Sequence, residues 1–253
     1  MLSSAAIQKL TAFLGTENVL TSQEDRITHS YDGTPLLRQL PEAVLRPRTT
    51  DQISAILRLA HEEGFAVVPR GSGSGLSGGS IPVDNSVVLL TNHWTKILEV
   101  DERNLTAWVE PGVITARLHA EVESRGLFYP PDPGSAAIST IGGNVAENAG
   151  GLRGLKYGVT KNYVLGMEVV LPSGEVMMLG GKSVKDVAGY NLKDVLIGSE
   201  GTLGIFTRIL LRLIPKPESS RTMLAFFDSM SDAAETVSEI IAARITPAAL
   251  EFL

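Results

Sequence analysis

The chain has 253 residues, of which 43% are hydrophobic and 20% charged, with a formal net charge of −6 and no cysteine. This composition is typical of a soluble globular protein, and the acidic balance argues against nucleic acid as a partner. The lack of cysteine excludes disulfides, thiolate nucleophiles, thiolate metal ligands and cysteinyl attachment of a cofactor. No secretory signal pattern and no run of about 18 apolar residues is present, so we expect a cytoplasmic protein without a membrane span.

The first third of the chain indicates helices alternating with strands. Apolar residues at helical spacing predict a short helix that ends at Gly15. A Thr-x-x-Gln capping box at residues 49–52 predicts a second helix, which ends at Gly64. The apolar runs 66–68 and 87–90 predict two buried strands.

A loop rich in glycine and serine, residues 69–80, separates these two strands. Glycine permits positive φ angles and close approach, so consecutive backbone N–H groups can point inward around an anion. A flexible linker is the alternative, but linkers do not usually sit between two buried strands. The loop contains G-x-G-x-x-G at residues 73–78, yet a strand and not a helix follows. We therefore reject a Rossmann dinucleotide site and predict a strand–loop–strand phosphate cradle.

The middle of the chain contains a second region rich in glycine and proline. It follows a predicted hairpin over residues 97–109 and a predicted helix for which Thr115 is the cap. The small residues of segment 129–151 would let a flat group approach the backbone, while Asn144 and Asn148 offer donors and acceptors. A surface loop is the alternative, although about 20 residues without regular structure would be unusual in a compact domain.

A third glycine loop, residues 198–204, lies between a predicted hairpin over residues 166–179 and a long strand over residues 205–214. The sequence Gly181-Lys-Ser is not a P-loop, because the required first glycine would fall at Val176 inside a strand.

The pattern changes after Pro217. A strand at 222–227, a helix capped by Ser231 and a strand at 248–253 are predicted. Such a unit cannot bury both of its faces alone, so we expect residues 218–253 to be the beginning of an incomplete second domain with exposed apolar faces.

Together the three loops closely resemble the FAD-binding domain of FAD-linked oxidases. These proteins form the vanillyl-alcohol-oxidase-like superfamily, with a PCMH-type FAD-binding domain, and the sequence is most similar to its glycolate oxidase D-subunit and D-lactate dehydrogenase branch. The resemblance extends over about residues 30–253. The segments that carry it are Pro69–Gly79, Pro130–Ser135, Ile141–Asn148 and Gly198–Ile205.

The resemblance implies an α+β fold and a C-terminally truncated chain. Residues 1–217 would form the PCMH-type domain from two α+β subdomains, at about 1–100 and 101–217. Residues 218–253 would begin a ferredoxin-like cap domain that carries part of the substrate site.

The resemblance also implies where FAD binds. Backbone amides of residues 70–76 would wrap the pyrophosphate, and Pro111 would lie near the flavin. Residues 131–135 and 142–148 would line the isoalloxazine and the extended FAD chain, and residues 200–205 would reach the ribose and adenine. The implied cofactor-binding residues are Pro69, Arg70, Gly71, Ser72, Gly73, Ser74, Gly75, Leu76, Pro111, Pro131, Asp132, Pro133, Ser135, Ile141, Gly142, Gly143, Asn144, Glu147, Asn148, Gly151, Glu200, Gly201, Gly204 and Ile205. Relatives with covalent FAD use histidine or cysteine, which the first loop lacks, so binding should be non-covalent.

No catalytic residue or metal ligand is assigned. In the family the second half of the cap supplies a histidine base, arginine clamps and metal-ligating histidines, and this sequence does not contain that half. The histidines His29, His61, His93 and His119 show no metal-binding spacing, and two of them lie in predicted helices.

Three functions remain open at this point. The first is oxidation of a small 2-hydroxy acid, of the glycolate or D-lactate type, to the 2-oxo acid with hydride transfer to the flavin. Its partners would be that acid and an electron acceptor or partner subunit. The second is a non-catalytic FAD-binding or assembly module. The third and weakest is a phosphate- or nucleotide-binding domain without a redox role.

Overall fold

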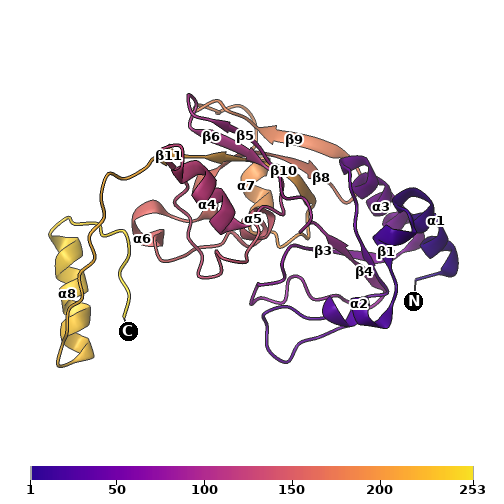
Figure 1. Ribbon diagram of the computed structural model, residues 1–253, viewed down its shortest axis with the longest axis horizontal. Coiled ribbons are helices and arrows are strands. Elements are labelled where there is room, and N and C mark those ends of the chain that lie inside the picture. Colours follow the sequence, from indigo (N-terminus) through magenta and orange to yellow (C-terminus); the bar gives the residue numbers. More distant parts are fainter. Residues whose placement is uncertain (1, 253) are drawn as a thin grey trace.

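The computed structural model describes residues 2–252, which form two large β-sheets, each with helices packed against it, and a small two-stranded sheet (Figure 1). The first sheet has the order β1-β2-β4-β3. Strands β2, β4 and β3 are parallel, and β1 runs antiparallel to β2. Its elements are α1 (Ser4–Leu14), the 3-10 helix η1 (Thr16–Asn18), β1 (Val19–Leu20), α2 (Gln23–Thr28), β2 (Ala43–Leu45), α3 (Thr50–Glu63), β3 (Ala66–Arg70) and β4 (Ser86–Leu90).

Helix α3 confirms Thr49 as the cap but not the reciprocal half of the capping box, because the Gln52 side chain accepts from the Arg48 N–H at 2.6 Å and not from that of Thr49. The Thr49 hydroxyl accepts a hydrogen bond from the Gln52 N–H at 3.2 Å, and Gly64 ends the helix with φ +71°. The buried face of α3 packs with α1 on the sheet, and the core strand β4 is buried throughout. Continuous burial explains why β4 reads as an unbroken apolar run, as central parallel strands do.

The second sheet is entirely antiparallel, with the order β5-β6-β10-β8-β9. Both predicted hairpins are confirmed, and the long predicted strand ends at Arg212, after which residues 214–215 pair with a separate short strand. The elements of this layer are β5 (Ile97–Asp101), β6 (Thr106–Val109), α4 (Thr115–Glu123), β7 (Leu127–Phe128), α5 (Ile141–Glu147), α6 (Gly154–Tyr157), the 3-10 helix η2 (Thr160–Tyr163), β8 (Val164–Val170), β9 (Val176–Gly180), α7 (Leu192–Leu196), β10 (Ile205–Arg212) and β11 (Ile214–Pro215).

One sequence prediction in this layer was wrong, and one helix was not predicted. Thr115 does not cap α4, because it is the first helical residue and its hydroxyl contacts Ser139 and Asn144 instead. The segment after Thr140 forms the helix α5, which Thr140 caps, so the alternative of a surface loop does not hold there. Burial of Ile141 and Val145 in the core of the second sheet outweighs the poor helix propensity of the two glycines between them.

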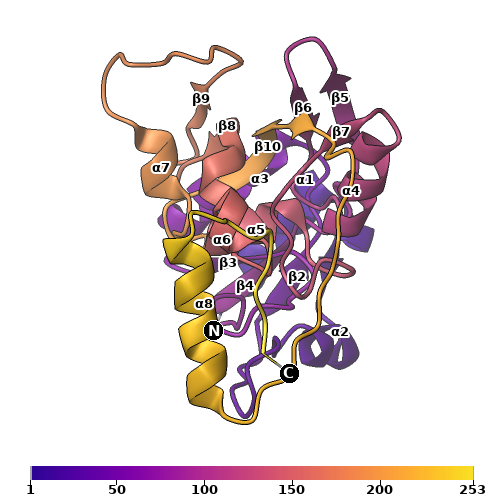
Figure 2. The same ribbon diagram turned by 90° about the vertical axis from the view of Figure 1, so that its left-hand side faces the viewer.

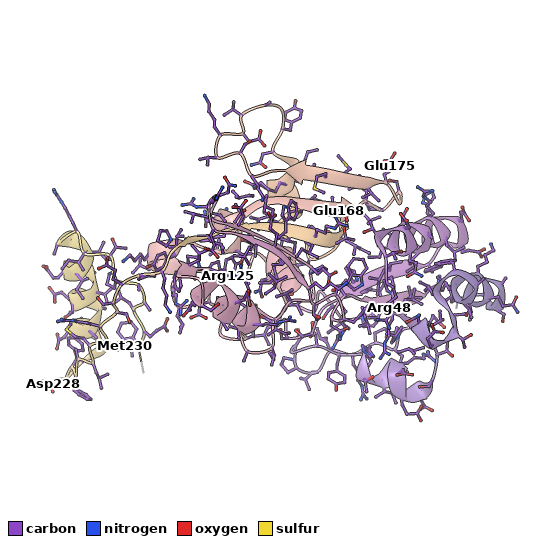
Figure 3. All side chains as sticks on the ribbon, turned by 45° about the horizontal axis from the view of Figure 1, so that its top comes forward. Arg48, Arg125, Glu168, Glu175, Asp228 and Met230 are labelled. Carbon is purple, nitrogen blue, oxygen red and sulfur yellow. The ribbon has the colours of Figure 1, made fainter. Side chains whose placement is uncertain are left out.

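Helix α3 joins the two layers. The Thr50 hydroxyl donates to Glu168 Oε1 on β8 at 3.0 Å, and the Ser54 hydroxyl donates to the Gly174 carbonyl in the β8–β9 turn at 2.5 Å. Val170 and Ile205 of the second sheet complete the core of the first. In Figure 3, Glu168 lies on the second sheet near the side that faces the first layer. These contacts hold the two layers in one arrangement.

The C-terminal segment lies apart from both layers in Figure 1, and its helix is in front of them in Figure 2. It contains the helix α8 (Met230–Ala242), whose cap is Ser229 and not Ser231, and within residues 222–252 no strand forms. The prediction of a strand at 222–227 is thus wrong. The strand predicted at 248–253 does not form over residues 248–252, and Leu253 lies outside the described residues. Ala233 is the buried residue of α8. Large apolar side chains are exposed as expected: Met223, Leu224, Phe226, Phe227, Met230, Ile241, Ile245 and Phe252.

Strands need a neighbour to pair with, and in this segment none is present within the described chain, which explains the missing strands. Figure 3 shows Asp228 and Met230 at the far end of the molecule from Arg48. The division into a domain at 1–217 and a second one from 218 stays a prediction. No helix among residues 2–252 has both the length and the apolar character needed to cross a membrane.

Candidate functional site

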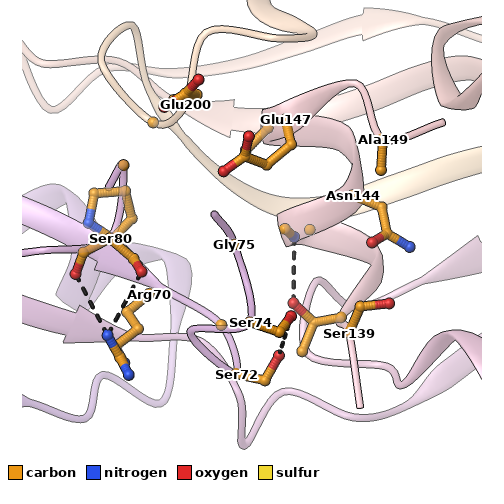
Figure 4. A pocket seen from close by; sticks show the side chains of 18 of the residues that line it. Arg70, Ser72, Ser74, Gly75, Ser80, Ser139, Asn144, Glu147, Ala149 and Glu200 are labelled. Carbon is orange, nitrogen blue, oxygen red and sulfur yellow. Dashed lines mark hydrogen bonds between the residues drawn. The ribbon is translucent and has the colours of Figure 1, made fainter. Parts of the chain in front are cut away.

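A cavity of about 390 Å³ lies where the loop after β3, helix α5 and the loop before β10 meet (Figure 4). Most of the residues predicted to bind a cofactor line it. It is also lined by Gly79, Ser80 and Ala146, which lie within predicted segments but were not singled out, and by residues that were not predicted, namely Thr91, Ser139, Thr140, Ala149, Gly150 and Phe206. The three glycine loops, distant in the sequence, therefore form one site.

Five predicted residues do not line this cavity: Pro131, Asp132, Pro133, Ile141 and Gly151. Ile141 is fully buried in the core of the second sheet. A Cβ atom at Gly151 would lie 1.9 Å from the Asp132 carbonyl oxygen, so these two segments pack on each other behind the cavity wall. The missing side chain at Gly151 therefore allows the two backbone segments to pack closely.

Some of the missed residues had a signal in the sequence. Thr140 stands three residues before Gly143, the spacing of an N-cap, and its hydroxyl accepts from the Gly143 N–H at 3.2 Å. Ser80 belongs to the predicted glycine loop, whereas Thr91 had no signal, because it lies just after β4 and only the fold brings it to the cavity.

The loop between β3 and β4 presents a row of free donors. Among residues 2–252, the backbone N–H groups of residues 71–76 have no hydrogen-bond acceptor. Gly73 has φ +68° and Gly78 has φ +83°, which reverse the chain as in anion-binding nests. Residues 71–76 are half-buried or exposed, so water can pair with these N–H groups until a ligand displaces it, and a row of such donors suits an anionic ligand such as a diphosphate. The predicted strand–loop–strand cradle is confirmed in its geometry, because no helix forms between Arg70 and Ser86.

The absence of side chains at three glycines brings the walls together. A Cβ atom at Gly71 would lie 2.2 Å from the Thr140 hydroxyl oxygen, and one at Gly142 would lie 2.6 Å from Pro111 Cβ. One at Gly79 would lie 2.5 Å from a Glu200 carboxylate oxygen. Larger residues at these positions would fill the cavity or force its walls apart.

Two carboxylates lie on the open side of the loop. The Ser77 hydroxyl lies 3.0 Å from Glu147 Oε1 and 3.1 Å from Glu200 Oε2, so it bridges the loop to both acids. Partial burial raises the pKa of Glu147 above its ordinary value, and the nearby charges of Glu200 and Asp32 raise it further, whereas the Ser77 hydrogen bond opposes the rise. Carboxylates accept hydrogen bonds, so this corner suits ligand hydroxyl groups and not phosphate.

Glu147 should make stability depend on pH. Because its pKa is raised in the folded state, folding retains a proton, and the resulting stability is present below the ordinary glutamate pKa and lost as pH rises through the raised value. We expect Glu147→Gln to have a higher melting temperature than wild type at neutral pH, because the charged carboxylate is removed, and a smaller difference from wild type at pH 4. The gain should not exceed about 2–4 °C, the effect of 1 kcal/mol in a chain of this size, because solvent screens the side chain. Thermal unfolding monitored by circular dichroism tests this, and an equal shift at both pH values contradicts it.

The two asparagines already have protein partners. Asn144 is buried, and its side-chain amide donates to the Thr115 hydroxyl at 2.7 Å. Asn148 adopts φ +51° at the end of α5, and its side-chain oxygen accepts from the Lys161 N–H at 3.0 Å. Both hold α5 in place, and both also line the cavity.

The histidines contribute nothing to this cavity. All four lie within residues 2–252, and none lines it. His119 contacts the Pro131 carbonyl at 2.9 Å and His93 the Pro47 carbonyl at 2.6 Å. In the described part of the chain, no three histidine or acidic side chains are grouped so that they could hold a metal ion.

Comparisons with known proteins agree with this geometry. Residues 41–180 match the family described as FAD binding domain, and residues 216–253 match the family described as FAD linked oxidases, C-terminal domain. The whole chain is 54% identical to glycolate oxidase subunit GlcD of Bacillus subtilis (strain 168), of which it covers 54%. Over 241 residues, 95% of this chain, it is 39% identical to D-lactate dehydrogenase of Anaerostipes hadrus, of which it covers 50%. The chain thus spans about half the length of the curated relatives it matches.

Solved structures show the same fold. Alkyldihydroxyacetonephosphate synthase superposes with a TM-score of 0.85 at 24% identity, over 98% of this chain and 47% of that one. p-Cresol methylhydroxylase superposes with a TM-score of 0.76 at 24% identity, over 95% of this chain and 48% of that one. The predicted α+β fold of PCMH type and the resemblance to FAD-linked oxidases are confirmed. A row of free N–H donors lies where the three glycine loops meet, as a site for an anionic cofactor requires. From this geometry and the match of residues 41–180, the chain belongs to the FAD-binding domain family, whose cofactor is FAD.

Proposed function

We propose that this chain is the FAD-binding portion of an oxidoreductase that oxidises a small 2-hydroxy acid to the 2-oxo acid. The observation that carries the proposal is the row of unpaired N–H groups at residues 71–76, facing a cavity that small residues keep open. The relatives named glycolate oxidase subunit and D-lactate dehydrogenase support this substrate class.

Each part of the cavity has a proposed task. The amides of residues 71–76 hold the diphosphate, and Glu147 and Glu200 accept hydrogen bonds from sugar hydroxyls. Gly142, Gly143 and Ala149 leave room for a flat ring, and the remaining predicted residues that line the cavity complete its wall. Non-covalent binding is supported because no histidine lines the cavity and the sequence has no cysteine.

The reaction removes a hydride from C2 of the acid and a proton from its hydroxyl group. Bound FAD supplies the hydride acceptor. The residues of this chain bind and orient the cofactor, and none is assigned as the base that takes the proton. We propose that an electron acceptor or partner subunit completes the system, since one relative is named a subunit, and that the protein acts in the cytoplasm.

A non-catalytic FAD-binding module is the second candidate. It is favoured by the C-terminal segment, which buries little apolar surface and leaves its large apolar side chains exposed. In this case the cavity would bind FAD without a complete substrate site.

One experiment separates the two candidates. The purified 253-residue chain is incubated with FAD, freed of excess cofactor and examined for flavin absorption; anaerobic glycolate or D-lactate is then added. We expect stoichiometric yellow protein whose flavin absorption near 450 nm is bleached by the acid. Retained colour without bleaching supports the non-catalytic module, and loss of all flavin on desalting contradicts both candidates.

A further inference from the structure

Arg70 is a buried cation at the beginning of the glycine loop, residues 69–80. What we infer about its role rests on the proposed function, in which this loop binds the diphosphate of FAD. Arg70 is the last residue of β3, and its carbonyl oxygen accepts from the Thr91 N–H at 2.9 Å. Its residue surface is only 7% exposed although it forms part of the cavity wall. Arginine is rarely buried unless it is paired, so this position needs an explanation.

The guanidinium has few partners. Nη1 lies 3.5 Å from both the carbonyl oxygen and the hydroxyl oxygen of Ser80, which are long contacts (Figure 4). The Ser80 hydroxyl in turn donates to Asp32 Oδ2 at 3.3 Å. Within residues 2–252, Arg70 has no carboxylate at ion-pair distance. The guanidinium therefore ties the beginning of the loop to its end without being neutralised there.

The Arg70 guanidinium also packs against Gly73, in the middle of the glycine loop. A Cβ atom at Gly73 would lie 2.1 Å from Arg70 Nη2 and 2.3 Å from Cζ. Gly73 has φ +68°, so this residue both turns the chain and rests on the guanidinium. The planar group supports the bend in which the N–H groups of residues 71–76 remain free. The compact ammonium of lysine has neither the plane nor the fork needed to make both contacts.

A second segment supports the loop from the N-terminal region. The Gly33 N–H donates to the Gly75 carbonyl at 3.0 Å, and Asp32 is held by the Thr34 N–H at 2.7 Å. The loop is thus fixed at Gly73, Gly75 and Ser80, and Arg70 takes part in two of these contacts. Arg70 forms part of the cavity wall, but Gly73 rests on its guanidinium and leaves the residue only 7% exposed.

We propose that Arg70 is a positioning residue, which shapes the diphosphate-binding loop through Gly73 and Ser80 and does not itself bind the cofactor. Shape, and not charge alone, is the requirement. A lysine at this position would keep the positive charge but would leave the loop unsupported. Arg70→Lys should therefore keep the positive charge but lose affinity for FAD.

The test compares FAD affinity in the 253-residue wild type, Arg70→Lys and Arg70→Ala, with Arg103→Ala in the exposed 102–105 turn as matched control. Titration followed by flavin fluorescence gives Kd, and circular dichroism gives the melting temperature of each apoprotein. We expect both Arg70 variants to lose about tenfold or more in affinity, and the control to stay within about twofold of wild type. Guanidinium ion at non-denaturing concentration should restore part of the affinity of Arg70→Ala, whereas methylammonium should not.

The outcomes separate this inference from the proposed function. Wild-type affinity in Arg70→Lys overturns the positioning role, because charge would then suffice. Equal rescue of Arg70→Ala by methylammonium and guanidinium overturns it as well. Should Arg70→Ala not fold, Arg70→Lys still decides. Failure of the wild-type chain to bind FAD overturns the proposed function together with this inference, whereas normal binding by wild type and Arg70→Lys overturns the inference alone.

Discussion

Replacing Gly71 with valine is expected to weaken FAD binding strongly. A Cβ atom at this position would lie 2.2 Å from the Thr140 hydroxyl oxygen and 3.3 Å from Thr140 Cβ. Thr140 is buried and caps α5, so it cannot turn away without uncapping that helix. The added methyl groups must therefore separate the loop from α5. Overpacking of this kind costs roughly 1–3 kcal/mol, so we expect an affinity loss of about 10- to 100-fold.

Gly181→Val is the matched control for this substitution. A Cβ atom at Gly181 would have no heavy atom within 4 Å, and the residue lies outside the cavity. Equilibrium titration with FAD should therefore give a wild-type Kd for Gly181→Val. If Gly71→Val and Gly181→Val bind FAD equally well, FAD does not occupy this cavity in the manner proposed.

Tyr129→Ala is expected to cause a large loss of stability. The side chain is fully buried in the core of the second sheet and packs edge-on against Tyr163, with ring centroids 6.0 Å apart and an interplanar angle of 79°. Removing a buried aromatic ring costs about 3–5 kcal/mol, because apolar contacts are lost and a cavity remains. Denaturant unfolding of the apoprotein should show this loss as a lower transition midpoint with little change in slope.

Tyr129→Phe provides the control. The Tyr129 hydroxyl is buried and makes no hydrogen bond of normal geometry within the described chain; burial raises its pKa far above the ordinary value, and the nearby Thr160 side chain offsets only part of that rise. Removing an unsatisfied hydroxyl while keeping the ring should leave the free energy of unfolding within about 1 kcal/mol of wild type, or raise it. A loss as large as that of Tyr129→Ala would show that the hydroxyl has a stabilising partner.

Local sequence signals predicted the framework of the site well. The run at 87–90 is apolar because β4 is buried, whereas residues 66–68 of β3, which were also predicted to be buried, are half-buried; the glycines between the two strands leave few alternatives to an irregular loop. The strand after G-x-G-x-x-G was sufficient to reject a Rossmann site, and the structure has no helix there.

Tertiary contacts decided the parts that were predicted wrongly. Helix α5 contains Gly142 and Gly143, which disfavour a helix in isolation, but a cap and two buried apolar residues compensate. Segment 222–227 has strand-like composition but no partner strand within the described chain. The role of Gly151 in the cofactor site stays a prediction, and the structure shows the backbone at Asp132 packed against this glycine. A sequence shows that a close approach is possible but does not show what approaches.

Strands β3 and β4 are parallel neighbours, and the segment that connects them contains no helix. Parallel neighbours require a crossover long enough to return to the starting edge of the sheet, a task that a helix usually performs. Here the glycine loop performs it, so its length is set by the return path as well as by the ligand. Residue exchanges within this loop can change what it binds, but insertions or deletions would also alter the strand pairing of Val68 with Val88. Engineering of cofactor preference in this fold should therefore proceed by substitution at constant loop length.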